Sequence, residues 1–141
     1  MYKLLLFFLP AILILSGNNQ FTNMEKPATP ANKEISMISF QDEAGSGKMS
    51  SIEFKSQEYC RAELENFDFD AHFSIVSATV YFSGANFKNI EKGTIKSSSL
   101  KPISDLMKRC LPGTMVVFDD VKVKGPDDKL RTIKGLSLLL Y

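Results

Sequence analysis

The sequence predicts an all-β domain, an immunoglobulin-like β-sandwich with one short helix. Residues Phe73 to Phe82 alternate between two sets of side chains with a period of two, and β-branched and aromatic residues dominate both sets. Thr114 to Lys124 has the same strand character. The tetrapeptide Gly125-Pro126-Asp127-Asp128 that follows it is typical of a turn, which predicts a β-hairpin.

The C-terminal residues extend this strand pattern. Lys129 to Ile133 is predicted to be the returning strand of the hairpin, and Gly135 a bend. Leu136 to Tyr141 is an apolar run, so we expect a strand that is buried on both faces and a chain that ends inside its fold.

Pro102 to Cys110 is the predicted helix. A proline near the first turn, an early acid at Asp105 and late bases at Lys108 and Arg109 suit the two ends of a helix. Apolar residues at helical spacing form the face expected to pack on the sheet; they are Ile103, Leu106, Met107 and Cys110. Leu111-Pro112-Gly113 is expected to end the helix.

The N-terminal part of the domain gives a weaker pattern. Glu34 to Gln41 alternates and predicts a first strand, and Ile52 to Lys55 predicts a short second one. Gly45 to Ser51 is interpreted as a flexible loop between them. Its Gly45-Ser46-Gly47-Lys48 stretch is not a phosphate-binding loop, because the earlier glycine is absent and Met49 stands where a hydroxyl is required.

Residues 1–17 are predicted to be a signal peptide that exports the chain to the periplasm or cell envelope. Lys3 precedes an apolar run from Leu4 to Leu15, which is about a dozen residues and too short to span a bilayer. Ser16-Gly17 offers small residues for cleavage, although Leu15 leaves an uncleaved signal anchor as the alternative. Residues 18–33 are polar and carry two prolines, which predicts a disordered linker before a domain at 34–141.

The composition restricts the classes of partner. The chain has 141 residues with 17 basic and 16 acidic side chains, so it lacks the charge excess that attracts nucleic acid.

The two cysteines allow two interpretations. A disulfide between Cys60 and Cys110 would close a loop of about 50 residues and stabilise the fold by about 4 kcal/mol. Alternatively, both are small buried residues.

An acidic cluster is a candidate cation site. Asp68, Asp70 and His72 would lie on one side of an extended chain, with Asp119-Asp120 as further ligands. The closing glutamate of a calcium loop is absent, so a solvated turn is the favoured interpretation and no metal or cofactor is predicted. A catalytic site without a sequence motif would need carboxylates that are distant in the sequence, such as Glu63 and Asp119, to meet in a cleft. No catalytic motif is recognisable, and we expect no enzyme.

The quoted segments together resemble a known family. AELENFDFD with FSIVSATVYFSG, then LMKRC and PGTMVVFDDVKVKGPDDKLRTIKGLSLLLY, resemble the C-terminal domain of GldM, the periplasmic gliding-motility and type IX secretion protein. The resemblance runs from about Ala62 to Tyr141 and implies a β-rich periplasmic module that binds proteins without catalysis. Proteins of the GldM type are longer and carry a membrane helix of an ion-driven motor, so the motor role is not implied.

These observations predict a protein-interaction module of the cell envelope, with secretion or gliding machinery as its partners. We expect exposed charges on its loops to bind the partner, namely Lys88, Lys92, Asp127 and Asp128. The alternative is a periplasmic sensor or small-ligand-binding domain derived from the same module.

Overall fold

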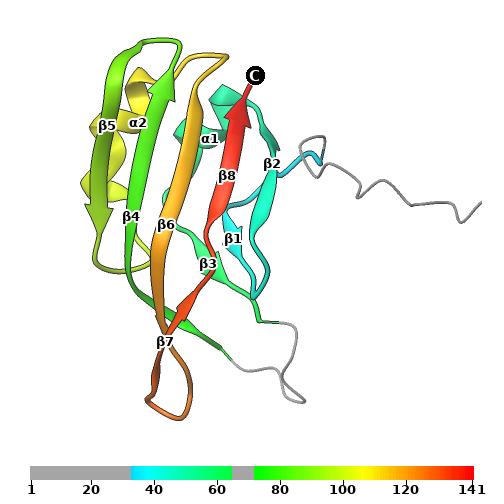
Figure 1. The fold of residues 1–141 in the computed structure, drawn as a ribbon, viewed down its shortest axis with the longest axis vertical. Coiled ribbons are helices and arrows are strands. Elements are labelled where there is room, and N and C mark those ends of the chain that lie inside the picture. The colour runs from blue at the N-terminus through cyan, green and yellow to red at the C-terminus, as the bar shows by residue number, and fades with distance from the viewer. Residues whose placement is uncertain (1–32, 65–71) are drawn as a thin grey trace, which may run out of the picture.

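The computed structural model describes residues 33–64 and 72–141. They form a six-stranded sheet with a second layer packed on one of its faces (Figure 1). The second layer contains a small two-stranded sheet and two short helices. The predicted all-β class with little helix is confirmed.

The large sheet has the order β2-β8-β6-β4-β5, and β7 pairs with β6 off this path. Its strands are β2 (Gly45–Met49), β4 (Ser74–Gly84), β5 (Phe87–Ile95), β6 (Met115–Lys124), β7 (Leu130–Ile133) and β8 (Leu136–Leu140). The pair of β2 and β8 is parallel, and the other pairs of this sheet are antiparallel.

The second layer lies behind the sheet in the view of Figure 1. It consists of the parallel pair β1 (Ser39–Phe40) and β3 (Arg61–Ala62) with helices α1 (Ser51–Ser56) and α2 (Ser104–Arg109). A 3₁₀ turn, η2 (Lys101–Ile103), leads directly into α2.

Aromatic contacts join the two layers. Phe40 of β1 meets Phe118 of β6 edge to face at 5.3 Å between ring centroids. Phe54 of α1 meets Phe82 of β4 in the same way at 6.5 Å, and Phe82 stacks on Phe87 of β5. All five rings are buried, so they form the centre of the hydrophobic core.

The alternation predicted along β4 is interrupted once. Phe73 and Ile75 are buried at the start, whereas Ala78, Val80 and Phe82 are buried further on, which is a change of parity. The register with β6 shifts on both sides of Ser77. A β-bulge therefore moves the buried set by one residue, which a strict period of two does not predict.

The prediction that the last strand is buried on both faces is wrong. Leu136, Leu138 and Leu140 are buried, but Leu139 is 39% exposed, so β8 buries one face only. Its backbone is nevertheless paired on both edges, with β2 and with β6. The C-terminal residues do lie inside the fold, through hydrogen bonding rather than through two-sided burial.

Two predictions in the N-terminal part are also wrong. The expected loop at 45–51 contains strand β2, and the expected strand at 52–55 is helix α1, so the domain has two short helices. The Ser50 side chain accepts a hydrogen bond from the Ile52 amide at 3.3 Å, which is the N-cap of α1. The strand expected from Glu34 to Gln41 is reduced to β1.

The remaining elements agree with the sequence. The predicted helix is present as η2 and α2, and it ends before Gly113, which has φ +91°. The hairpin turn is closed by hydrogen bonds between Gly125 and Lys129 and between Asp128 and Gly125.

The predicted signal peptide at 1–17 and most of the predicted linker lie outside the described residues. Lys33, which the linker was expected to include, accepts a hydrogen bond from the Lys48 amide at 2.7 Å. Within the described part of the chain, no helix has the length and apolar character needed to cross a membrane.

Candidate functional site

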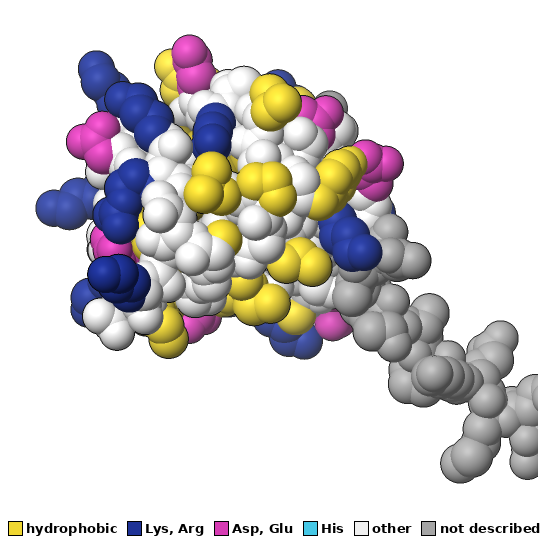
Figure 2. Space-filling model, turned by 90° about the horizontal axis from the view of Figure 1, so that it is seen from above, with side chains coloured by type: hydrophobic (Ala, Val, Ile, Leu, Met, Phe, Trp, Pro, Cys, Tyr) yellow, Lys and Arg dark blue, Asp and Glu magenta, His cyan; other side chains and the backbone are white. Residues whose placement is uncertain are grey.

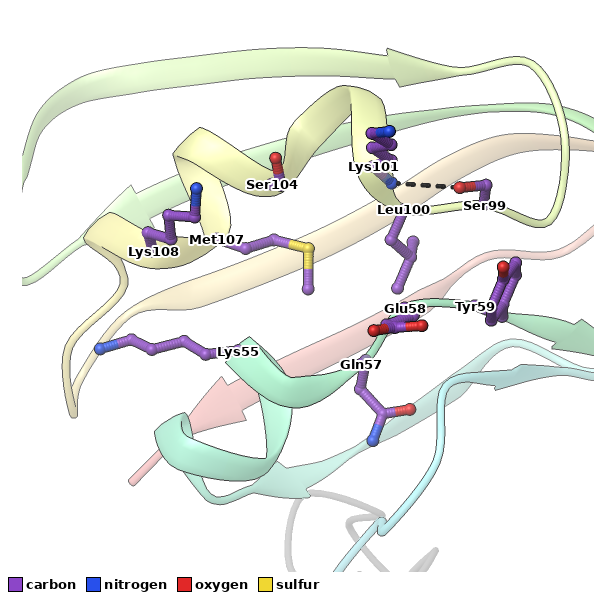
Figure 3. A pocket seen from close by; sticks show the side chains of 10 residues that line it. All are labelled: Lys55, Gln57, Glu58, Tyr59, Ser99, Leu100, Lys101, Ser104, Met107 and Lys108. Carbon is purple, nitrogen blue, oxygen red and sulfur yellow. Dashed lines mark hydrogen bonds between the residues drawn. The ribbon is translucent and has the colours of Figure 1, made fainter.

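A cleft of about 460 Å³ opens between α1 and α2 on the side of the molecule that carries the second layer (Figure 3). It is lined by residues of α1, of the segment after it, and of η2 and α2. They are Lys55, Gln57, Glu58, Tyr59, Ser99, Leu100, Lys101, Ser104, Met107 and Lys108.

Backbone hydrogen bonds fix the walls of the cleft. Tyr59 and Ser99 form an isolated antiparallel bridge. The Leu100 amide donates to the Glu58 carbonyl at 2.9 Å, and the Cys60 amide donates to the Ser98 carbonyl at 2.9 Å. The segment after α1 is therefore tied to the segment before η2, although the two are far apart in the sequence.

The base of the cleft is apolar. Leu100 and Met107 are 1% and 3% exposed, and both side chains point toward the space between the helices in Figure 3. Packing of η2 on the sheet holds this base in place, because a Cβ at Gly93 of β5 would lie 2.5 Å from Ile103 Cγ2. A glycine at this position allows the close approach.

The rim of the cleft is positively charged. Three lysines, Lys55, Lys101 and Lys108, line it together with one acid, Glu58, so the lining carries a formal charge of +2. Lys108 lies 3.4 Å from Asp105 on its own helix, and both side chains are highly exposed. Within residues 33–64 and 72–141, no carboxylate lies within 4.0 Å of the ammonium groups of Lys55 and Lys101.

A second surface is the face of the large sheet away from the helices. Tyr81, Val117 and Ser137 are in register across β4, β6 and β8, and Met115 is in register with Leu139. Met115 is 46% exposed. This outer face therefore presents apolar side chains between polar ones.

Figure 2 looks onto the end of the sheet at which β8 finishes. Hydrophobic side chains gather on this end, with lysine and arginine side chains toward one side of it. Ile52 and Tyr141, which are 78% and 49% exposed, lie at this end, where the Ser51 amide bonds to the Tyr141 carbonyl.

The four predicted binding residues do not come together. Lys88 and Lys92 are exposed on β5, an edge strand, so the prediction that they lie on a loop is wrong. Asp127 and Asp128 lie, as predicted, in the exposed turn of the β6–β7 hairpin, which forms the lower end of the molecule in Figure 1.

Both aspartates of the hairpin are engaged in ion pairs. Asp127 accepts two hydrogen bonds from Arg131 at 2.8 and 2.7 Å, and Asp128 lies 2.7 Å from Lys124. The pKa of Asp127 is lowered to about 2, and the hydrogen bonds from Arg131 are the largest cause. These contacts hold the shape of the turn, while the side chains of Asp127 and Asp128 remain 38% and 85% exposed.

The two cysteines are free, buried thiols in the structure. Cys60 Sγ lies 3.4 Å from the Ser98 carbonyl, and Cys110 Sγ lies 3.5 Å from the Leu106 carbonyl. Burial raises the pKa of Cys60 to about 12 and that of Cys110 to about 11. The structure thus contains no disulfide between them, and the alternative of two small buried residues describes their environment.

The residues considered for a cation site are dispersed where they are described. His72 is exposed, and Asp68 and Asp70 lie outside the described residues. Asp119 accepts a hydrogen bond from the amide of Asp120, whose carboxylate lies 3.5 Å from Lys122. In the part of the chain that the structure describes, no three His, Cys, Asp or Glu side chains are grouped so that they could hold a metal ion.

The carboxylates considered for a hidden enzyme lie on separate elements. Glu63 is exposed just after β3, and its amide bonds to the Phe40 carbonyl, while Asp119 is exposed on β6.

Sequence reasoning missed the lysines of the cleft. Lys55 falls in the predicted strand Ile52 to Lys55, and Lys108 counts only as a base near the end of the predicted helix. Lys101 precedes that helix and has no predicted role. The N-cap serine, the early Glu53 and the late Lys55 of α1 were the available signals for a helix at this point.

Comparison with known proteins gives one family. A family model described as the GldM C-terminal domain matches residues 26–140, which begins inside the predicted linker and includes all described strands. No curated protein matches the chain.

Proposed function

The chain belongs to the family of GldM C-terminal domains, and from this membership we propose that it is a protein-interaction module of the cell envelope. The family relates it to gliding motility and type IX secretion. In the proposed role, the domain binds a protein component of that machinery and catalyses no reaction. The observation that carries the proposal is the match over residues 26–140, which includes almost the whole described domain.

The proposal includes export. Residues 1–17 would act as the signal peptide and deliver the domain to the periplasm, where the machinery of this family works. Cell fractionation of a C-terminally tagged chain tests this step. The tag should appear in the periplasmic or envelope fraction, and substitution of Leu4 to Leu15 by polar residues should retain it in the cytoplasm.

Affinity capture tests partner binding. The tagged chain, expressed in its own cells and cross-linked before lysis, should recover the same envelope proteins in replicate purifications. Reversal of two charges on β5, Lys88→Glu with Lys92→Glu, tests whether the edge strand contributes to capture. A matched control is Lys129→Glu, which changes an exposed lysine in the hairpin.

The hairpin aspartates need a separate variant. Asp128→Asn removes one carboxylate and leaves the pair between Asp127 and Arg131 in place. Reproducible capture that depends on a surface charge supports an interaction module. Failure of the exported, folded chain to recover any envelope protein, under conditions that recover a known complex of the same machinery, would refute it.

Small-ligand binding is the second candidate function. The volume of the cleft, about 460 Å³, falls in the range of small-molecule pockets, which is the observation that favours it.

A further inference from the structure

The cleft between α1 and α2 has the electrostatics of an anion-binding surface. Its lining carries a formal charge of +2, whereas the whole chain carries +1, so positive charge is concentrated here. Lys55 and Lys108 lie at one end in Figure 3, and Glu58 lies nearer the other end, beside Gln57 and Tyr59. A ligand with negative charges would meet two ammonium groups at the lysine end.

The base of the cleft adds an apolar requirement. Leu100 and Met107 form the base, and methionine adapts its shape to different apolar side chains. A free inorganic anion would bind to the lysine ammonium groups and make no contact with these two residues. A ligand that uses the whole cleft therefore carries apolar groups beside its negative charges.

The shape of the cleft favours a chain segment over a flat surface. The apolar base lies between two helices, and its two residues are almost completely buried. A membrane surface could reach the lysines on the rim but not this base. Tyr59 and Ser104 also line the cleft, and a hydroxyl group can bond to a peptide backbone.

We infer that the cleft binds a short acidic segment of the partner protein, with carboxylates beside Lys55 and Lys108 and an apolar side chain over Leu100 and Met107. This inference rests on the proposed role as an interaction module. It names the surface and the chemistry of the partner, because charge complementarity selects aspartate and glutamate and the apolar base selects residues such as leucine between them.

A peptide titration followed by NMR tests the inference. The probe is acetyl-Glu-Leu-Glu-Leu-Glu-amide, and the matched peptide has glutamine at each glutamate position. Added to the ¹⁵N-labelled purified chain, the acidic peptide should shift the amide signals of Ser99, Lys101, Ser104 and Lys108. We expect the glutamine peptide to bind at least tenfold more weakly, and the affinity of the acidic peptide to fall as salt is added.

Matched charge reversals locate the site. Lys55→Glu with Lys108→Glu should lower the affinity for the acidic peptide at least tenfold, because two attractive charge interactions become repulsive. Lys129→Glu with Lys134→Glu makes the same change of charge at the two ends of β7, outside the cleft, and should leave the affinity unchanged. All four lysines are exposed, so both double variants should keep the dispersed NMR spectrum of the fold. Lys55→Gln with Lys108→Gln provides a milder variant if the reversal disturbs folding.

Several results would overturn the inference. Equal affinity for the two peptides would mean that the charges of the lysines do not contribute to binding. Equal affinity for free glutamate and the acidic peptide would indicate a small-ligand site. Signal shifts confined to β5 or to the outer face of the sheet would move the site elsewhere. If the cleft variants still capture the envelope partner as the unsubstituted chain does, the inference about the cleft fails while the proposed function stands.

Discussion

Replacement of Leu138 by alanine should cost about 3 to 4 kcal/mol of unfolding free energy. Leu138 is fully buried in β8, and a Leu→Ala change in a core costs about 2 to 5 kcal/mol. Its neighbours on either side are Gly47 of β2 and Val116 of β6. Glycine has no side chain that could fill the cavity and valine is short, so we expect the cost in the upper part of this range.

Leu139→Ala is the matched control. It is the same substitution one residue further along the same strand, but the Leu139 side chain lies on the outer face and is 39% exposed. We expect a cost of about 1 kcal/mol, from partial burial and the lower strand propensity of alanine.

Urea unfolding followed by far-UV circular dichroism measures both variants. A domain of this size has a total stability of about 5 to 15 kcal/mol, so both should remain folded without urea. The midpoint should decrease much more for Leu138→Ala, with an unchanged slope. Equal losses for the two variants would refute the reasoning, because they would mean that the outer face of β8 is covered as well.

Three further predictions concern other parts of the domain. Denatured protein should contain two titratable thiols, whereas native Cys60 and Cys110 should react slowly with iodoacetamide at pH 8; a single reactive thiol or none after denaturation would contradict the free state. Because their folded pKa values of about 12 and 11 lie above the ordinary thiol pKa of 9.0, the unfolded chain loses its thiol protons first. The stability that they contribute is therefore complete below about pH 9 and is lost as the pH rises through the folded values, and Cys60→Ala should reduce this alkaline loss. Carboxyl NMR should place the titration of Asp127 near pH 2, and a midpoint near 4 would show that its arginine partner in the hairpin is not bound in solution. Gly93→Ala should cost about 1 to 3 kcal/mol, because the new Cβ would lie 2.5 Å from Ile103, and Ile103→Ala should relieve part of that cost in the double variant; additive losses would mean that the two residues do not touch.

The strands that the sequence predicted well are those whose local signals agree with their environment. In β6 and β7 the residues flanking the turn are strand formers, and the Gly125 to Asp128 tetrapeptide supplies the turn itself. Local chemistry and tertiary pairing lead to the same structure there.

Strand β2 could not be predicted because its local composition is that of a loop. It becomes a strand through parallel pairing with β8, from Gly45 opposite Leu136 to Met49 opposite Leu140. Gly47 also serves packing, since a Cβ there would lie 2.4 Å from the Cδ1 atom of Ile35. Only the tertiary structure shows this need for a small residue.

The candidate cleft required the same long-range information. Lys55 and Lys108 belong to two segments that become neighbours through the bridge between Tyr59 and Ser99. The sequence predicted the helix that carries Lys108 but not α1, whose alternating Ile52 and Phe54 resemble a strand over so short a stretch. The wall of the cleft that α1 forms was therefore not predicted from the sequence.

The central position of β8 has a consequence for the order in which the domain can form. Until β8 is in place, β2 has no strand to join it to β6, and the sheet consists of a β4–β5–β6–β7 part without its N-terminal edge. The pairing of Gly45 with Leu136 joins residues from nearly opposite ends of the described chain, and such distant pairings make folding slow. Emerging segments would therefore stay incomplete until β8 arrives, so the sheet can close only when nearly all of the described domain is available.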